Sequence, residues 1–213
     1  IPLRLVGSEM CIRDSLIATP IGNREDISMR ALDVLKKVDV IACEDTRHSS
    51  QLLSVFGIKK KLISLNQHNE QEKAKIIASI IKDKKSVAYV SDAGTPAISD
   101  PGALLVDHIH NLSLDIFPIP GPSALITAFS VAGFQTTHFQ FYGFLPNTSG
   151  KCKKALQKIY NSDMVCILYE SPHRIIKTLK VIREIFGDEH FVFIAREPVS
   201  YTHLRSPRDV EES

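Results

Sequence analysis

The sequence has 213 residues, 44% of them hydrophobic and 23% charged, with a formal net charge of +2 at pH 7. These values suit one large or two compact domains that need no disulfides, and so weak a positive charge neither requires nor excludes a nucleic-acid partner. The longest nearly apolar stretch, residues 124–134, is too short to cross a bilayer, and four cysteines without a CxxC pair or a zinc-finger spacing indicate reduced thiols of a cytosolic protein.

Helical and strand patterns alternate along the chain. The hydrophobic periodicity predicts helices at residues 27–38, 52–56, 104–112, 122–133, 151–160 and 171–186, and one more that Asn69 begins. Strands are expected at residues 40–43, 62–65, 86–91, 114–119, 139–145, 165–170 and 191–196. Strands separated by helices of this length predict an α/β fold with parallel sheets covered on both faces.

The helix that begins at Asn69 carries two further expectations. Glu72 stands three residues after Asn69, which is the spacing of a capping box. The buried face of this helix is expected to consist of Ile76, Ile77, Ile80 and Ile81.

A proline-rich segment, PIPGP at residues 118–122, predicts a domain boundary. Proline holds itself and its predecessor in extended backbone, so this segment is a stiff crossing. We therefore expect an N-terminal α/β domain at residues 16–119 and a C-terminal α/β domain at residues 120–198.

The segments that follow the strands are the candidate site, because ligands of open α/β sheets bind beyond the carboxyl ends of the strands. These segments are TPIGN at 19–23, EDTRH at 44–48, DAGTP at 92–96, GFLP at 143–146 and ESPHR at 170–174. The loop at residues 91–102 is the most informative, since two aspartates, two glycines and two prolines in one loop favour a functional role. We expect the turns to converge on one crevice, with those at Thr95 and Ser123 on the same side of the protein.

Several common site motifs are absent from the sequence. It has no GxGxxG after the first strand, no GxxxxGK[ST], no GxSxG and no HExxH. A nucleotide-dependent dehydrogenase, a P-loop NTPase, an α/β-hydrolase and a zinc protease are therefore disfavoured, and no metal site is expected.

Nine motifs occur in the order in which one known family has them: ATPIGN, RALDVL, ACEDTRHS, HNE, VSDAGTPAISDPG, PIPGPSA, GFLP, YESPHR and ARE. From about Leu16 to Glu197 the chain resembles the ribosomal RNA small subunit methyltransferase I family of the tetrapyrrole methylase superfamily, the class III methyltransferases. The resemblance implies a cytoplasmic homodimer that methylates the 2′-hydroxyl of cytidine 1402 in 16S ribosomal RNA of the small subunit, with S-adenosylmethionine as donor. It also implies two α/β domains, a parallel first sheet and a mixed, here truncated second sheet, with the donor in the cleft between them.

The resemblance also implies roles for individual residues. The donor-binding residues would be Pro20, Gly22, Asp92, Gly94, Thr95, Pro96, Pro122, Ser123 and Ala124. The RNA-facing residues would be Arg47, His48 and Arg174, with His173 as a further candidate.

A ribose hydroxyl needs a group that takes its proton, and the sequence leaves this base open. Asp100, His173 and Glu170 are taken as the catalytic candidates, beside Asp92, Glu44 and His48. An imidazole at His173 would stand in the first turn of a helix, whose positive end lowers its pKa. Asp92 and Asp100 are equally consistent with only shaping the donor loop.

Two other functions compete with this interpretation. The same fold serves methyltransferases of tetrapyrroles and of diphthine intermediates, from which ACEDTRHS, HNE and YESPHR separate this chain. A non-catalytic RNA-binding module is the second alternative, with lysines 151, 153 and 154 as a candidate phosphate-binding surface.

Both ends depart from the family pattern. The segment SEMCIRDS places Glu9, Arg13 and Asp14 where apolar strand residues are expected, and the chain after Glu197 no longer follows the family. We therefore expect residues 1–15 and 199–213 to be non-native and the second domain to be incomplete.

Overall fold

The computed structural model describes residues 14–197, and the chain divides into two compact units, residues 1–123 and residues 124–213. We call them the N-terminal and the C-terminal unit. The division falls just after the PIPGP segment, whereas the sequence placed the boundary inside it, between residues 119 and 120.

A five-stranded parallel sheet forms the centre of the N-terminal unit. The sequence predicted a parallel sheet and four of these strands, but not the one at residues 15–17. Its strands are β1 (Ser15–Ile17), β2 (Val40–Cys43), β3 (Lys61–Ser64), β4 (Val87–Val90) and β5 (Phe117–Ile119). They lie in the order β3-β2-β4-β1-β5, and every neighbouring pair is parallel. β1 and β4 are therefore neighbours although more than sixty residues separate them in the chain.

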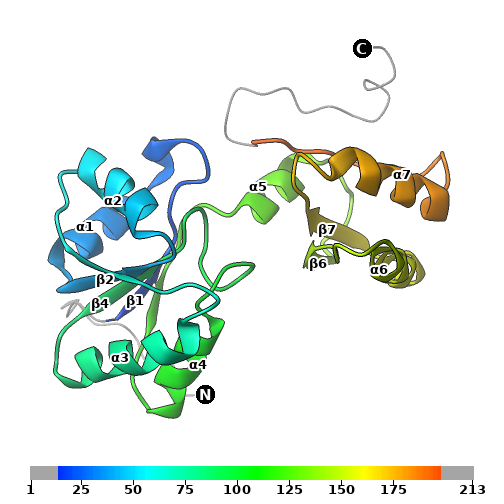
Figure 1. The fold of residues 1–213 in the computed structure, drawn as a ribbon. Helices are drawn as coiled ribbons and strands as arrows, with labels where there is room; N and C mark the ends of the chain where they lie inside the picture. The colour runs from blue at the N-terminus through cyan, green and yellow to red at the C-terminus, as the bar shows by residue number, and fades with distance from the viewer. Residues whose placement is uncertain (1–13, 198–213) are drawn as a thin grey trace. The chain divides into compact units, whose positions relative to one another are not determined.

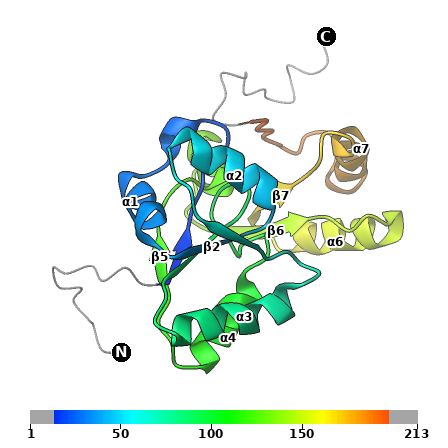
Figure 2. The same cartoon turned by 60° about the vertical axis from the view of Figure 1, so that its left-hand side comes forward.

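Four helices cover the two faces of this sheet. They are α1 (Met29–Lys37), α2 (Thr46–Val55), α3 (Glu70–Lys82) and α4 (Ala103–Asn111). One core cluster joins α1 and α2 to one face of the sheet, and a second joins α3 and α4 to the other. Figures 1 and 2 show these two layers on either side of the strands. A short 3-10 helix, η1 (Arg24–Asp26), precedes α1.

The central strands are buried on both faces because their residues alternate between the two clusters. In β2, Ile41 and Cys43 join the α1–α2 cluster, and Val40 and Ala42 join the α3–α4 cluster. All four residues are buried, so the strand reads as a continuous apolar run without a polar face.

The helix α3 corrects the sequence-based expectations. The Asn69 side chain makes no cap hydrogen bond and bonds instead to the Asn66 amide, so the expected capping box with Glu72 is wrong. The buried face consists of residues 70, 74, 77 and 78, whereas Ile76 is 40% exposed and only Ile77 of the predicted face is fully buried. The burial of Glu70 at the first position sets this rotation, because residues four, seven and eight further on lie on the same side of a helix.

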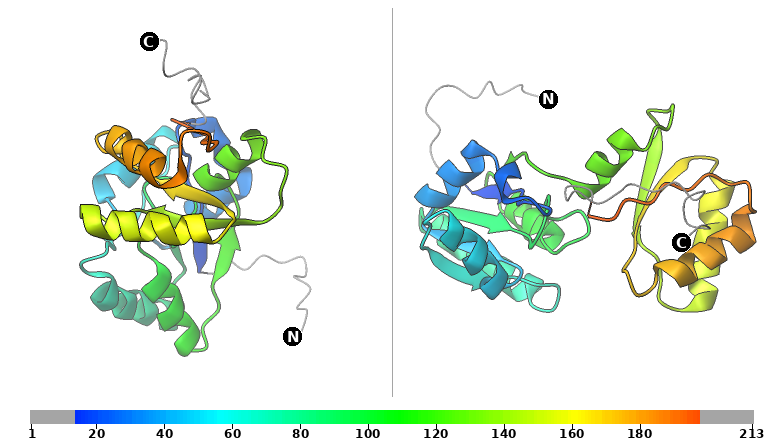
Figure 3. Two further views of the ribbon diagram at one scale, coloured as in Figure 1. Left: turned by 90° about the vertical axis from the view of Figure 1, so that its right-hand side faces the viewer. Right: turned by 90° about the horizontal axis from the view of Figure 1, so that it is seen from above.

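The C-terminal unit has a smaller sheet. Its elements are α5 (Ala124–Val131), β6 (Phe139–Phe144), α6 (Ser149–Asn161), β7 (Val165–Tyr169) and α7 (Ile175–Phe186). β6 pairs with β7 in parallel, with a register shift between Phe141 and Gly143. The helices α6 and α7 lie side by side (Figure 3) and share one core cluster. The ring of Tyr160 packs edge-on against that of Phe186.

Several expectations for this unit need correction. The strand predicted at residues 191–196 is not formed, since only Ile194 makes a single bridge there, and the second sheet as far as it is described has two parallel strands instead of a mixed set. α7 begins at Ile175 and not at Ser171, because residues 172–174 form a turn. His173 therefore precedes the helix and does not lie in its first turn.

The other large boundary difference concerns α2, which begins six residues before the predicted position. Asp45 is its N-cap and accepts hydrogen bonds from the backbone amides of Arg47 and His48. This cap satisfies free amides at the helix start, which makes a polar stretch helical where hydrophobic periodicity gives no signal.

The expectation of non-native ends falls mostly outside the described residues. Within them, Asp14 accepts a hydrogen bond from the Val87 amide, and Ser15 is the buried first residue of β1. These two residues therefore belong to the first sheet. No helix within residues 14–197 is long and apolar enough to cross a membrane.

The rotation of α3 leads to a matched pair of substitutions. Ile77→Ala removes a side chain that is 1% exposed and should lower the free energy of unfolding by about 2–5 kcal/mol. Ile76→Ala, on the neighbouring position of the same helix, should cost about 1 kcal/mol or less. Urea denaturation followed by circular dichroism measures both, and equal losses would show that the helix is rotated differently.

Candidate functional site

The turns after β1, β4 and β5 come together at one edge of the first sheet. Thr19, after β1, and Gly94, after β4, exchange backbone hydrogen bonds of 2.9 and 3.0 Å. The Thr19 hydroxyl also donates to the Ser91 carbonyl at 3.1 Å, and the Thr95 hydroxyl donates to the Pro122 carbonyl at 3.1 Å. The predicted convergence of the Thr95 and Ser123 turns is thus confirmed, because Pro122 directly precedes Ser123.

At this edge the chain leaves two neighbouring strands toward opposite faces of the sheet. α1 follows β1 on one face of the sheet, whereas α4 follows β4 on the other. The loops after these two strands therefore diverge, and such a switch point is where open α/β sheets bind ligands.

Glycine is required at two of the turns. Gly94 has φ +80°, and a Cβ added there would lie 3.2 Å from the Ile21 side chain. A Cβ on Gly121 would lie 2.9 Å from the Ala18 Cβ, at the end of β1. An added Cβ would thus make a tight contact with the Ile21 side chain at position 94, and at position 121 it would force a shift of the chain or of Ala18.

A cavity of about 240 Å³ opens among these turns. It is lined by Pro20, Gly22, Arg24, His48, Gln51, Leu52, Asp92 and Ala93. Three predicted donor-binding residues and one predicted RNA-facing residue thus line the same cavity. Its volume is below the roughly 300–1,000 Å³ of a typical small-molecule site, so it holds only part of a ligand of that size.

Three carboxylates influence one another at this edge of the sheet, and one of them, Asp92, lines the cavity. The side chain of Asp92 accepts a hydrogen bond from the Asp45 amide at 3.2 Å, and Glu44 and Asp100 feel its charge. Burial raises the pKa of both Glu44 and Asp100, and the charge of Asp92 raises each pKa further. The edge is consequently a partly desolvated negative region, which attracts a cation and holds protons more tightly than an exposed carboxyl does.

The predicted site residues of the C-terminal unit have a different role. The side chain of Glu170 is 6% exposed, and it accepts hydrogen bonds from the Ser171 amide and the Thr178 hydroxyl. It also pairs with Arg174 at 3.4 Å. A carboxylate held by these partners is poorly suited to take a proton from a substrate, so the structure argues against Glu170 as a base.

Arg174 is likewise occupied inside the unit. Its guanidinium donates to the Asn147 side chain at 2.5 Å and to the carbonyls of Leu145 and Pro146 at 3.1 and 3.3 Å. It therefore ties the loop after β6 to the start of α7, and this argues against the predicted RNA contact. His173 lies in the exposed turn between Glu170 and α7. Within residues 14–197, no hydrogen bond holds its side chain as those of Arg174 do.

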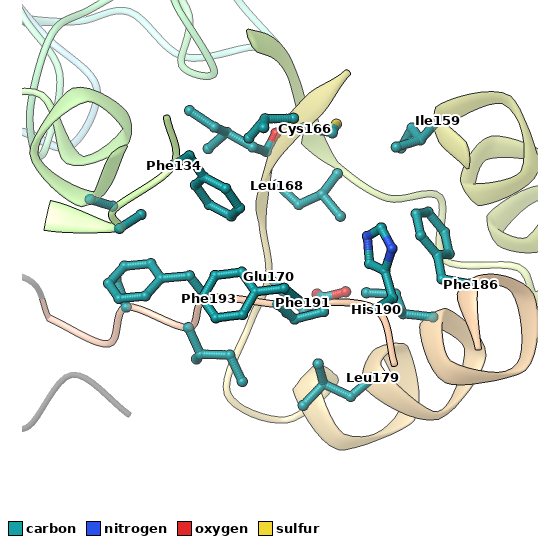
Figure 4. A pocket seen from close by; sticks show the side chains of 18 of the residues that line it. Phe134, Ile159, Cys166, Leu168, Glu170, Leu179, Phe186, His190, Phe191 and Phe193 are labelled. Carbon is teal, nitrogen blue, oxygen red and sulfur yellow. Dashed lines mark hydrogen bonds between the residues drawn. The ribbon is translucent and has the colours of Figure 1, made fainter. Parts of the chain in front are cut away.

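A larger hollow of about 940 Å³ lies within the C-terminal unit. Figure 4 shows Phe134, Phe191 and Phe193 on one side of it and Phe186 and His190 on another. Its lining is mostly aliphatic and aromatic, and its acidic residues are Asp163, Glu170 and Glu189. Of these carboxylates, Glu170 is already paired with Thr178 and Arg174, and none of the strand-end turns of the first sheet reaches this hollow, so the candidate site is the edge of the first sheet.

Two residues near the loop at 91–102 were missed in the sequence. Glu70 accepts backbone hydrogen bonds at the start of α4, and the Tyr89 hydroxyl donates to the Pro101 carbonyl at 2.7 Å. The HNE motif contains Glu70 and was a usable signal, but helix spacing directed attention to Glu72 instead. As for metals, residues 14–197 contain no group of three or more His, Cys, Asp or Glu side chains placed to hold an ion.

Comparison with known proteins identifies relatives over most of the chain. The family model of the Tetrapyrrole (Corrin/Porphyrin) Methylases matches residues 15–202. The chain is 47% identical to ribosomal RNA small subunit methyltransferase I of Haemophilus influenzae, over 85% of this chain and 64% of that protein. It is 45% identical to the protein of the same name from Thermotoga maritima, over 85% of this chain and 81% of that protein.

The chain thus spans less than two thirds of the length of several of these relatives. Among solved structures, the methyltransferase CobJ matches with a TM-score of 0.67 at 18% identity, over 92% of this chain and 87% of that one. The cobalt precorrin-4 methyltransferase CbiF matches with a TM-score of 0.66 at 16% identity, over 94% of this chain and 88% of that one. At such low identity these two structures establish the fold alone.

The close approach at Gly121 predicts a large effect of one methyl group. Gly121→Ala should push the turn after β5 away from Ala18 and lower the free energy of unfolding by about 1–3 kcal/mol. Gly150→Ala is the matched control, because its Cβ would meet nothing within 4 Å and the helix α6 favours alanine by about 1 kcal/mol. Thermal unfolding compares the two, and a neutral Gly121→Ala variant would contradict the tight packing of this edge.

The buried carboxyl of Asp100 predicts a stability that falls with rising pH. Its raised pKa means that the folded protein binds more protons than the unfolded chain above the ordinary pKa of 3.8, so stability decreases as pH rises through this window. Asp100→Asn should therefore raise the melting temperature at pH 7 by a few degrees and weaken the pH dependence. Asp107→Asn, on the exposed side of α4, is the control. A lower melting temperature for Asp100→Asn at pH 7 would refute this electrostatic account.

Proposed function

Because this chain belongs to the tetrapyrrole (corrin/porphyrin) methylase family, and within it to ribosomal RNA small subunit methyltransferase I, we propose that it methylates a ribose 2′-hydroxyl of 16S ribosomal RNA. The methyl donor is S-adenosylmethionine and the target nucleotide is cytidine 1402. The observation that carries the proposal is the convergence of the family's motif loops at one edge of the first sheet, in a chain about 45% identical to these relatives over 85% of its length.

The donor-binding part of the proposal is supported by the chemistry of that edge. S-adenosylmethionine carries a positively charged sulfonium, and the carboxylates of Glu44, Asp92 and Asp100 supply a partly buried negative field. Pro20, Gly22 and Asp92 line the cavity at this edge, and Thr95 is held against the turn of Pro122. We assign Gly94, Pro96, Ser123 and Ala124 to the same donor site on the family motif.

The geometry narrows the choice of the base. Methyl transfer from a sulfonium to a hydroxyl oxygen releases a neutral thioether and requires that the hydroxyl lose its proton. A general base works best when its pKa lies near the working pH, and burial moves Asp100 and Glu44 in that direction. We therefore propose Asp100 as the base, with Glu44 and the cavity-lining His48 as alternatives and Glu170 as a structural residue.

We place the RNA-facing surface at the start of α2. The side chain of Arg47 is 89% exposed, and its ion pair with Asp45 at 3.3 Å is a surface pair of little stabilising value, which a phosphate can replace. His48 follows it and lines the cavity. Both lie in the stretch ACEDTRHS, whereas Arg174 is occupied by its contacts inside the C-terminal unit.

The remaining parts of the proposal follow from the relatives. An RNA substrate of the small ribosomal subunit places the enzyme in the cytoplasm, and we propose a homodimer by analogy with the family. We also propose that the C-terminal unit is a part of a larger domain. Its large apolar hollow and the coverage of about 64% of several relatives support this.

The proposed function predicts methyl transfer that depends on the donor loop. Small ribosomal subunits from a strain that lacks this modification are incubated with the chain and S-adenosylmethionine labelled in the methyl group. We expect label in 16S ribosomal RNA, resistance to alkaline cleavage at cytidine 1402, and a rate reduced at least about a hundredfold in Asp100→Asn.

The controls separate the possible failures. Calorimetry with the donor alone tests whether the edge of the first sheet binds it, and Asp107→Asn should behave as the wild-type chain. Donor binding without methyl transfer would favour a non-catalytic RNA-binding protein. Label in a tetrapyrrole and none in RNA would assign the chain to the other branch of its superfamily.

A further inference from the structure

Glu70 caps a helix to which it does not belong. It is the first residue of α3, it is 7% exposed, and its Oε1 accepts hydrogen bonds from the backbone amides of Gly102, Leu104 and Leu105 at 2.8, 2.9 and 3.2 Å. These amides form the start of α4, whose own N-cap is Gly102 and offers no side chain. A carboxylate at this place satisfies free amides and the positive end of the helix together.

The same point is the fixed end of the proposed donor loop at residues 91–102. The Tyr89 hydroxyl, from inside the sheet, donates to the Pro101 carbonyl at 2.7 Å. Gly102 has φ +128°, and a Cβ there would lie 2.7 Å from the ring of Tyr89. Glu70 of α3 and Tyr89 of β4 therefore bind the backbone of two consecutive residues, Gly102 and Pro101.

The loop between its ends is held in a strained conformation. Ala97 has φ +64°, a region that residues with a side chain rarely adopt, and its Cβ would meet a Cβ on Gly102 at 3.2 Å. Such a conformation persists only where the surroundings enforce it. At its other end the loop is fixed by the Thr19–Gly94 pairing, so Glu70 and Tyr89 provide the second anchor.

We propose that Glu70 is a positioning residue of the donor site: by capping α4 from α3, it fixes the Pro101–Gly102 backbone that carries Asp100 and thereby shapes the loop. The inference rests on the proposed function of that loop. Glu70 itself contacts no substrate in this scheme, because its Oε1 is bonded to the backbone amides of Gly102, Leu104 and Leu105, which follow Pro101 in the chain. This gives the HNE motif a physical role that its sequence alone did not reveal.

A test compares three substitutions at Glu70 in the full chain. Glu70→Ala removes the cap, Glu70→Asp draws the carboxylate back by one methylene, and Glu70→Gln keeps the size and an oxygen that still accepts from the amides. Glu72→Ala on the same helix is the control, because the side chain of Glu72 is 71% exposed and only pairs with Lys73.

Donor affinity is measured by calorimetry at a temperature where every variant is folded, together with hydrogen exchange of single amides. We expect affinity about tenfold weaker for Glu70→Ala and Glu70→Asp, and within about threefold of the wild-type value for Glu70→Gln and Glu72→Ala. The amides of Leu104 and Leu105 should exchange faster in the first two variants, while those of Val87 and Val90 in β4 stay protected. A general loss of stability would instead speed exchange in β4 as well.

Each result bears on the inference. Wild-type affinity in Glu70→Ala, or faster exchange throughout β4, overturns the positioning role while the proposed function stands. If Glu70→Ala does not fold, Glu70→Asp against Glu70→Gln decides in the same way. A wild-type chain that binds no S-adenosylmethionine refutes the donor site and this inference together, and the wild-type arm reveals that case directly.

Discussion

The pairing of Thr19 with Gly94 is the interaction on which the rest of the candidate site depends. It joins the ends of β1 and β4, neighbouring strands from which the chain leaves toward opposite faces of the sheet. Without it, the two loops would diverge freely, and the Thr95 hydroxyl would not reach the Pro122 carbonyl. Glycine suits both positions, because Gly94 has a φ of +80° and a Cβ on Gly121 would lie 2.9 Å from the Ala18 Cβ.

A second consequence of this convergence is electrostatic. Bringing the ends of β2 and β4 together places Glu44, Asp92 and Asp100 near one another, and the charge of Asp92 adds to burial in making ionisation of Glu44 and Asp100 less favourable. The folded chain accepts this repulsion although neutral side chains would be more stable there. A bound cation would relieve it, and so the same arrangement that weakens the free protein favours a positively charged ligand. Stability and binding therefore oppose each other at this edge, as is common where residues are placed for function.

The sequence predicted the first sheet well because buried parallel strands read as apolar runs with helices between them, as in VIAC at residues 40–43 and VAYV at 87–90. It predicted the convergence of the loops because their position after the strands follows from topology. The sequence-based prediction failed where a hydrogen bond from a side chain, and not hydrophobic periodicity, determines the rotation or the start of a helix. The rotation of α3 depends on where the Glu70 carboxylate finds the start of α4, thirty residues away, and the early start of α2 depends on the Asp45 cap. Neither contact leaves a periodic trace in the sequence.

The YESPHR motif of the C-terminal unit shows that a motif shared with a family does not establish a catalytic role for its residues. The glutamate and the arginine of YESPHR invite assignment as a base and a phosphate ligand, yet they bind each other, the Thr178 hydroxyl and the carbonyls of the loop after β6. They hold the shape of a loop, just as Glu70 of HNE binds the backbone amides at the start of α4. A buried charged residue must be paired to be tolerated, and the Glu170 carboxylate is paired with an amide, a hydroxyl and a guanidinium. Burial raises the pKa of Asp100, a hydrogen bond with the Ser91 side chain lowers it, and the charge of Asp92 raises it. This difference is the physical reason to test Asp100 before Glu170 as a proton acceptor.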